Sequence, residues 1–181
     1  MEEKVILAAL DEIGRRGLKF TMDDITRRLH ISKTSLYKMV PSKDALIAGI
    51  IQYQMDKSSV EEKRILAQPV NAEQKLIELV RSCIELFGVM GSIHDDLKYN
   101  YESEWELWEK NRREKIALVC SLIQQGAEEG VFRTVSPTLV QEALLAAVAA
   151  VSDSRFLRDN QISFEEAIDG IMDIMLHGIE K

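Results

Sequence analysis

The strongest constraint on the fold is the stretch at residues 21–46, which reads TMDDITRRLHISKTSLYKMVPSKDAL. It contains two short helical patterns joined by a tight turn, and a third helix begins after a Pro-Ser-Lys break. A serine or threonine stands before each pattern, as is typical of residues that cap helix N-termini. This order predicts a helix-turn-helix, which directs the end of its second helix into a DNA major groove.

Local signals predict how these helices begin and end. Thr21, with Asp24 three residues later, resembles a capping box with Asp in place of Glu. Ser32 and Ser42 are expected to cap the next two helices, and Pro41 disfavours helix at the residue before it. The first four helices are therefore expected at about residues 2–16, 21–29, 32–40 and 42–67.

The rest of the chain is also predicted to be helical. The 181 residues include only 9 Gly and 3 Pro, and apolar residues recur at helical spacing. Further helices are expected at about residues 72–89, 100–125 and 164–177. A short segment ends at about residue 98, and another helix begins at residue 137. The expected fold is all-α, with about nine helices. We divide it into an N-terminal three-helix DNA-binding domain at residues 1–48 and a helical regulatory and dimerisation domain at residues 49–181.

Charge and apolar content narrow the class of protein further. The net charge is −7, yet residues 1–57 hold ten Lys/Arg against eight Asp/Glu, and the remainder holds thirteen against twenty-two. This mildly basic N-terminal region, called the head below, suits local phosphate contacts better than nonspecific binding. The apolar run at residues 143–152 is too short to span a bilayer, and no secretion signal is visible. We expect a cytoplasmic protein without membrane contact, whose two cysteines are reduced core thiols.

Residues 17–46 resemble the TetR family of bacterial transcriptional regulators. The signature consists of Gly17, Phe20-Thr21, Asp24-Ile25, Ile31-Ser32, Ser35-Leu36-Tyr37, Pro41-Ser42-Lys43 and Leu46. The resemblance implies a regulator rather than an enzyme, with a helix-turn-helix head and a helical body that binds a small molecule and dimerises. The chain departs from the family pattern at Thr26, Met39 and Val40. It also has His30 where the family usually has the turn glycine.

The chemistry of the head suggests seven DNA-contacting residues. Side chains in the first turn of the third helix reach base edges first, and those further along meet phosphate. Helix N-termini favour anions through free backbone N–H groups. The candidates for base contact are Lys33, Thr34 and Ser35, and those for phosphate contact are Tyr37, Lys38, Thr21 and Lys43. The alternative is that Tyr37 belongs to the core and the lysines are simply solvated.

The middle helices suggest a ligand pocket. Its candidate residues are apolar, aromatic or sulfur-containing: Cys83, Phe87, Met90, Tyr101, Trp105 and Trp108. Such walls suit an apolar small molecule, and the glutamates between the tryptophans suit a cationic one. The alternative is ordinary core packing. His94 with Asp95 and Asp96 lacks a second histidine at metal-ligand spacing, so we expect no metal site and no cofactor.

The last two long helices suggest a homodimer interface. Residues 139–151 are rich in alanine, and the final helix carries an apolar stripe: Ile168, Ile171, Met172, Met175 and Ile179. The alternative is that both stripes are monomer core. The expected function is a ligand-responsive repressor that binds double-stranded operator DNA as a homodimer, with an unknown small-molecule effector. The open alternatives are a helical-bundle carrier or enzyme, and a regulator controlled by a partner protein.

Overall fold

The structure is a computed structural model that describes residues 2–91, 93–152 and 154–179, with backbone alone at 87, 89–91 and 154. The described residues form ten α-helices and one 3-10 turn, in agreement with the predicted all-α fold. Their bounds are α1 Glu3–Arg16, η1 Gly17–Lys19, α2 Met22–Leu29, α3 Lys33–Met39, α4 Lys43–Leu66, α5 Ala72–Gly91, α6 His94–Asn100, α7 Glu102–Glu128, α8 Pro137–Val151, α9 Ser154–Asn160 and α10 Phe164–Ile179.

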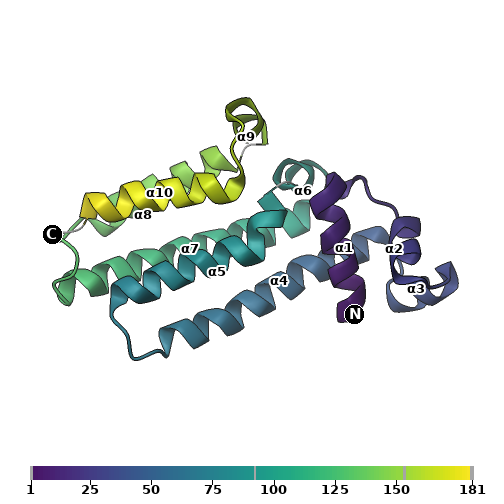
Figure 1. The fold of residues 1–181 in the computed structure, drawn as a ribbon, viewed down its shortest axis with the longest axis horizontal. Coiled ribbons are helices and arrows are strands. Elements are labelled where there is room, and N and C mark those ends of the chain that lie inside the picture. Colours follow the sequence, from purple (N-terminus) through teal and green to yellow (C-terminus); the bar gives the residue numbers. More distant parts are fainter. Residues whose placement is uncertain (1, 92, 153, 180–181) are drawn as a thin grey trace.

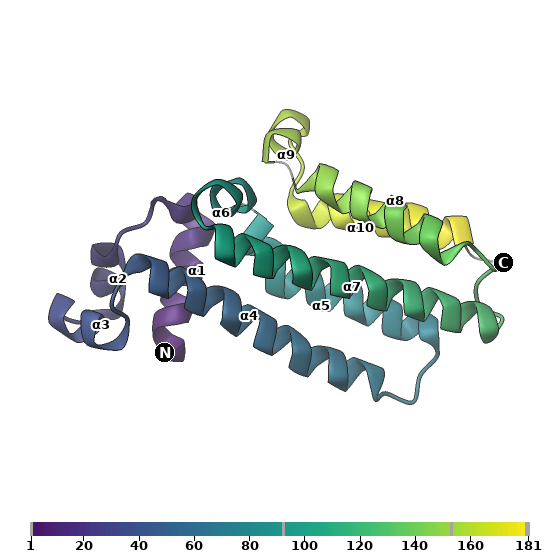
Figure 2. The same ribbon diagram turned by 180° about the vertical axis from the view of Figure 1, so that it is seen from behind.

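The helices form a small head at one end of an elongated body (Figure 1). Helices α1, α2 and α3 gather around the first part of α4, which then continues into the body. There α5 packs against both α4 and α7. Helices α8 and α10 pack against each other and cover α7 and α5, as the view from behind also shows (Figure 2).

The helix count differs from the sequence prediction by α9. About nine helices were expected, and the additional one, Ser154–Asn160, spans 7 residues. Two turns are too few for an apolar periodicity to stand out from a loop, so the pattern gave no signal there. Helix α7 also continues to Glu128, three residues beyond the predicted end at Gln125.

The predicted caps of the head are confirmed. The backbone N–H of Asp24 donates to Thr21 Oγ1 over 3.3 Å, and the backbone N–H of Thr21 donates to Asp24 Oδ2 over 2.8 Å. Ser32 Oγ accepts from the backbone N–H of Ser35, and Ser42 Oγ accepts from that of Ala45. These contacts satisfy N–H groups that lack helical partners, which fixes where α2, α3 and α4 begin.

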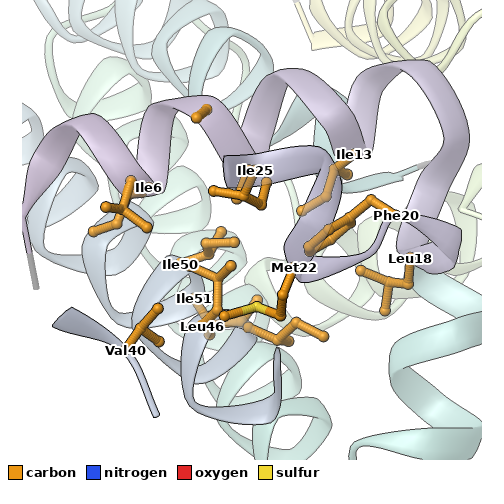
Figure 3. Packing of buried hydrophobic residues seen from close by; sticks show 14 of the residues in the cluster. Ile6, Ile13, Leu18, Phe20, Met22, Ile25, Val40, Leu46, Ile50 and Ile51 are labelled. Carbon is orange, nitrogen blue, oxygen red and sulfur yellow. The ribbon is translucent and has the colours of Figure 1, made fainter. Parts of the chain in front are cut away.

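One apolar core holds the head together (Figure 3). Its members include the fully buried Phe20, Ile25, Leu36, Val40, Leu46 and Ile50. The same cluster contains Ile93 and Leu97 of α6, and Trp108 of α7 packs against it. A second core lies in the body between α5, α7, α8 and α10. The head is therefore joined to the body through α6 and α7 as well as through α4.

The turn between α2 and α3 contains a left-handed residue that is not glycine. His30 has φ 53° and ψ 41°, and its backbone N–H donates to the carbonyl of Arg27. A side chain in this region crowds its own backbone by about 1–2 kcal/mol, a repulsion that glycine avoids. The turn therefore contains strain that the head core must offset.

We expect His30→Gly to raise the free energy of unfolding by about 1 kcal/mol, because glycine adopts this conformation without crowding. The matched control is Ala117→Gly, at an exposed position inside α7, which should lower it by about 0.5–1 kcal/mol. Urea denaturation at one fixed protein concentration measures both. Equal destabilisation by the two glycines would contradict the assignment of strain to His30.

Candidate nucleic-acid interface and ligand cavity

Helix α3 presents one face to solvent and anchors the other. Leu36 is fully buried in the head core, whereas Thr34, Ser35 and Lys38 are exposed. The side chain of Tyr37 is 48% exposed, so the alternative that places it in the core is wrong. Leu36 and the half-buried Met39, three residues apart, pack against the head core, so the exposed residues of α3 form a polar surface on the solvent side.

Lys33 begins α3 next to an acidic residue of α2. Its Nζ lies 2.8 Å from Asp23 Oδ2, and both side chains are more than half exposed. The hydrogen bond to Asp23 and the carboxylate charge raise the pKa of Lys33 above its ordinary value. The ammonium is therefore charged at neutral pH but partly compensated, and any other acceptor has to replace Asp23 as its partner.

The other two residues at helix N-termini are engaged inside the head. The Thr21 hydroxyl donates to Asp24 Oδ2 over 2.7 Å, and this bond holds the pKa of Asp24 below its ordinary value. Lys43 Nζ donates to the backbone carbonyl of Leu18 and lies 4.8 Å from the centre of the Phe20 ring. Thr21 and Lys43 thus have structural roles. The capping role of Thr21 was predicted, whereas the contact of Lys43 was missed because Lys43 and Leu18 are 25 residues apart.

Ion pairs fix the angle of α2 on α1. Arg28 Nε donates to Glu12 Oε1 over 2.8 Å, and Arg28 also pairs with Asp11. Arg16 pairs with Glu12 over 3.3 Å and with Asp24 over 3.5 Å. Because Glu12 is buried, these contacts are better shielded from solvent than surface pairs. Two of the basic residues in the head therefore support its shape.

A cavity of about 140 Å³ lies in the body between α5, α7, α8 and α10. Most of its lining is apolar, with Ile116 and Val119 from α7, and Leu144, Phe164 and Met172 from the covering layer. Two predicted ligand residues, Cys83 and Trp108, line it. Burial raises the pKa of the Cys83 thiol to about 11, so the thiol is neutral at physiological pH.

The remaining predicted ligand residues lie elsewhere or cannot be placed. Tyr101 and Trp105 pack against the head core and are not among the described residues that line the cavity. The Trp105 ring meets the His94 ring edge-on, with 4.8 Å between ring centres. The side chains of Phe87 and Met90 lie outside the described part of the chain. The two tryptophans thus have different surroundings: Trp105 supports the head, whereas Trp108 also faces the cavity.

The cavity has a polar side that the sequence analysis missed. Asn111, Arg112 and Lys115 line it from α7, and Ser152 lines it from the end of α8. Lys115 pairs with Glu62 of α4, yet burial lowers the pKa of Lys115 to about 8. Spacing could have revealed these residues, because Trp108, Arg112, Lys115 and Val119 follow one another at three or four residues on one side of α7.

Two classes of function find no support in the described ranges. No group of three or more His, Cys, Asp or Glu within them could hold a metal ion. None of their helices is both long enough and apolar enough to cross a membrane.

Comparisons with known proteins agree with this geometry. Residues 5–50 match the sequence model of the bacterial regulatory proteins of the tetR family. The chain is 24% identical to the uncharacterized HTH-type transcriptional regulator YvaF of Bacillus subtilis (strain 168), over 99% of this chain and 95% of that one.

Solved structures share the whole fold. A TetR-family regulator of Agrobacterium tumefaciens aligns with a TM-score of 0.76 at 16% identity, over 99% of this chain and 97% of that one. A transcriptional regulator of Saccharomonospora viridis in complex with choline has a TM-score of 0.76 at 17% identity, over 98% and 96%. The family consists of DNA-binding regulators rather than enzymes. The helix-turn-helix thus matches the tetR-family model over residues 5–50, and the whole chain shares the fold of solved regulators of the TetR family.

Proposed function

We propose that this regulator is a homodimeric repressor that binds operator DNA through α3 and releases it when a small molecule occupies the body cavity. The observation that carries the proposal is the exposed face of α3, which is held outward by the buried Leu36. Lys33, Thr34 and Ser35 lie in its first turn, where they can reach base edges. Tyr37 and Lys38 lie further along, where phosphate is the nearer partner.

Thr21 and Lys43 have a lesser part in this proposal. A phosphate at the start of α2 or α4 would use free backbone N–H groups and the helix dipole. Asp23 and Asp24 already place negative charge in the first turn of α2, and the Lys43 ammonium is bonded to Leu18. We therefore expect Lys33 and Lys38 to account for more of the DNA affinity than Thr21 and Lys43 do.

The proposed dimer uses faces of α8 and α10 that the monomer leaves open. On α8 the exposed residues Leu139, Ala143, Ala146 and Ala150 follow one another at three or four positions. On α10 the corresponding residues are Gly170, Ile174 and Gly178, and a Cβ at either glycine would meet no atom within 4 Å. Small residues at this spacing allow two helices to approach closely, so a second copy can pack here.

The interface stripe expected from the sequence has to be corrected. Met172 and Ile179 are buried in the monomer core, and Ile168, Ile171 and Met175 pack against the same core. The more apolar side of α10 is thus used to cover α5 within one chain. Ile174, which is 75% exposed, replaces Ile171 as the residue at the proposed interface.

Trp108 offers a route from the cavity to the head, because it lines the cavity and packs against the head core. We propose division at about residue 48 into a DNA-binding and a regulatory domain, with α6 and α7 bridging the two. A ligand changes DNA affinity only if it favours one arrangement of the two heads over the other. The choline complex of the Saccharomonospora viridis regulator supports small-molecule binding within this fold.

Lys33→Ala and Lys38→Ala test the DNA assignment on a duplex that the wild-type protein selects from random sequences. Lys33→Ala should weaken binding about tenfold and relax preference within the half-site, because a base contact is lost. Lys38→Ala should weaken binding to all sequences and reduce the salt slope by about one. Fluorescence anisotropy at several salt concentrations measures both effects.

The matched control is Lys63→Ala, an exposed lysine near the far end of α4. It removes the same charge from the same chain away from α3, so its affinity and salt slope should equal those of the wild type. If all three variants bind alike, α3 is not the DNA-reading element.

Ile174→Glu tests the dimer. A buried, unpaired carboxylate at the proposed interface should dissociate the dimer, while the exposed position leaves the monomer fold intact. The control is Val60→Glu on α4, where the side chain is 69% exposed, and this variant should remain dimeric. Sedimentation velocity at micromolar concentration distinguishes the states. A monomeric wild type, or a dimeric Ile174→Glu variant, would refute the interface.

A further inference from the structure

Arg112 places unused hydrogen-bond donors beside the cavity. Its Nη2 lies 2.6 Å from Glu109 Oε2, whereas its Nε and Nη1 are buried without a hydrogen-bond partner in the described part of the chain. A buried donor without a partner is unfavourable by about 1–3 kcal/mol and by more for a charged group. A guanidinium with open positions on the wall of a cavity therefore indicates a missing acceptor.

The polar groups on the lining favour an anion over a cation. Arg112 and Lys115 line the cavity, while their partners Glu109 and Glu62 are not among the described lining residues. No Asp or Glu stands among those lining residues at all. Glu109 Oε1 is also buried without a partner, but Glu109 is not among the described residues that line the cavity. A bound ligand thus meets cations first.

Lys115 adds to the same preference. Burial lowers its pKa to about 8, so its charged form is poorly compensated even with Glu62 nearby. An anion in the cavity would stabilise that charge. Ser152 contributes little, because its hydroxyl donates to the Val148 carbonyl over 2.7 Å and leaves only acceptor capacity toward the cavity.

We propose that the cavity binds an amphipathic carboxylate, with its carboxylate at Arg112 and its apolar chain against the residues of α8 and α10. This inference rests on the proposed role of the cavity as effector site. The remaining lining is mostly apolar, which suits the alkyl chain of such a ligand. Guanidinium groups bind carboxylates through charge-assisted hydrogen bonds, which makes Arg112 the specificity-determining residue.

Three probes with the same apolar chain test the charge preference: octanoate, octan-1-ol and octyltrimethylammonium. Binding is followed by isothermal titration and by Trp108 fluorescence in a Trp105→Phe background, which leaves one tryptophan at the cavity. Octanoate should bind at least tenfold more tightly than octan-1-ol, and octyltrimethylammonium should bind most weakly. Tighter binding of the ammonium probe, or equal binding of all three, would overturn the proposal.

Arg112→Gln locates the preference. It should weaken octanoate binding about tenfold or more and leave octan-1-ol binding unchanged. Arg113→Gln removes the same charge from an exposed neighbour and should retain wild-type binding of both probes. If Arg112→Gln fails to fold because Glu109 is left unpaired, the double variant Glu109→Gln/Arg112→Gln removes both charges and should show the same loss. Retained octanoate preference in these Arg112 variants would overturn the proposal.

The same probes separate this inference from the proposed function. Octanoate that binds through Arg112 but leaves DNA affinity unchanged would support the ligand class and refute ligand-controlled release. Release of DNA by octan-1-ol or by octyltrimethylammonium, with no Arg112-dependent binding of octanoate, would support release and overturn the ligand class.

Discussion

The structure depends on one helix, α4, which forms part of the head core and continues unbroken into the body. The first half of α4 buries Leu46, Ile47, Ile50 and Ile51 in the head. Each such side chain stabilises the fold by about 1.5–3 kcal/mol, so the head cannot leave α4 without losing most of its core. Further along the same unbroken helix, Gln54 donates to a backbone carbonyl of α5. The head therefore moves only as α4 moves.

Helix α7 also has two roles, because it supports the head and lines the cavity. Toward its start, Trp105 and Trp108 pack against the head core. From Trp108 onward the same side of the helix lines the cavity, and its two cations are paired with acids that stand off the wall. A ligand that alters the position of α7 also alters the surface against which the head is packed. The cavity and the head thus share one mechanical element, although they lie far apart in the sequence.

Sequence analysis succeeded where short-range chemistry decides the structure. The caps at Thr21, Ser32 and Ser42 involve residues three apart, so their signals are readable along the chain. It failed where a helix can pack by either of two sides. On α10 the richer stripe packed inward and left Gly170, Ile174 and Gly178 outside. It also missed Arg112, because a charged run on a helix usually faces solvent, and only the spacing of Arg112 from Trp108 and Val119 indicates a shared side.

Asp23 pairs with Lys33, so it competes with any bound acceptor for the lysine that begins α3. In the proposed complex, every duplex would have to displace the same carboxylate, whatever its sequence. A weak electrostatic contact gains little from that exchange, whereas a well-aligned base acceptor gains more than it replaces. In the complex proposed above, Asp23 would lower affinity for the vast excess of nonspecific DNA more than for the operator. An acidic residue within the proposed DNA-binding surface would thus sharpen discrimination between sites without touching a base.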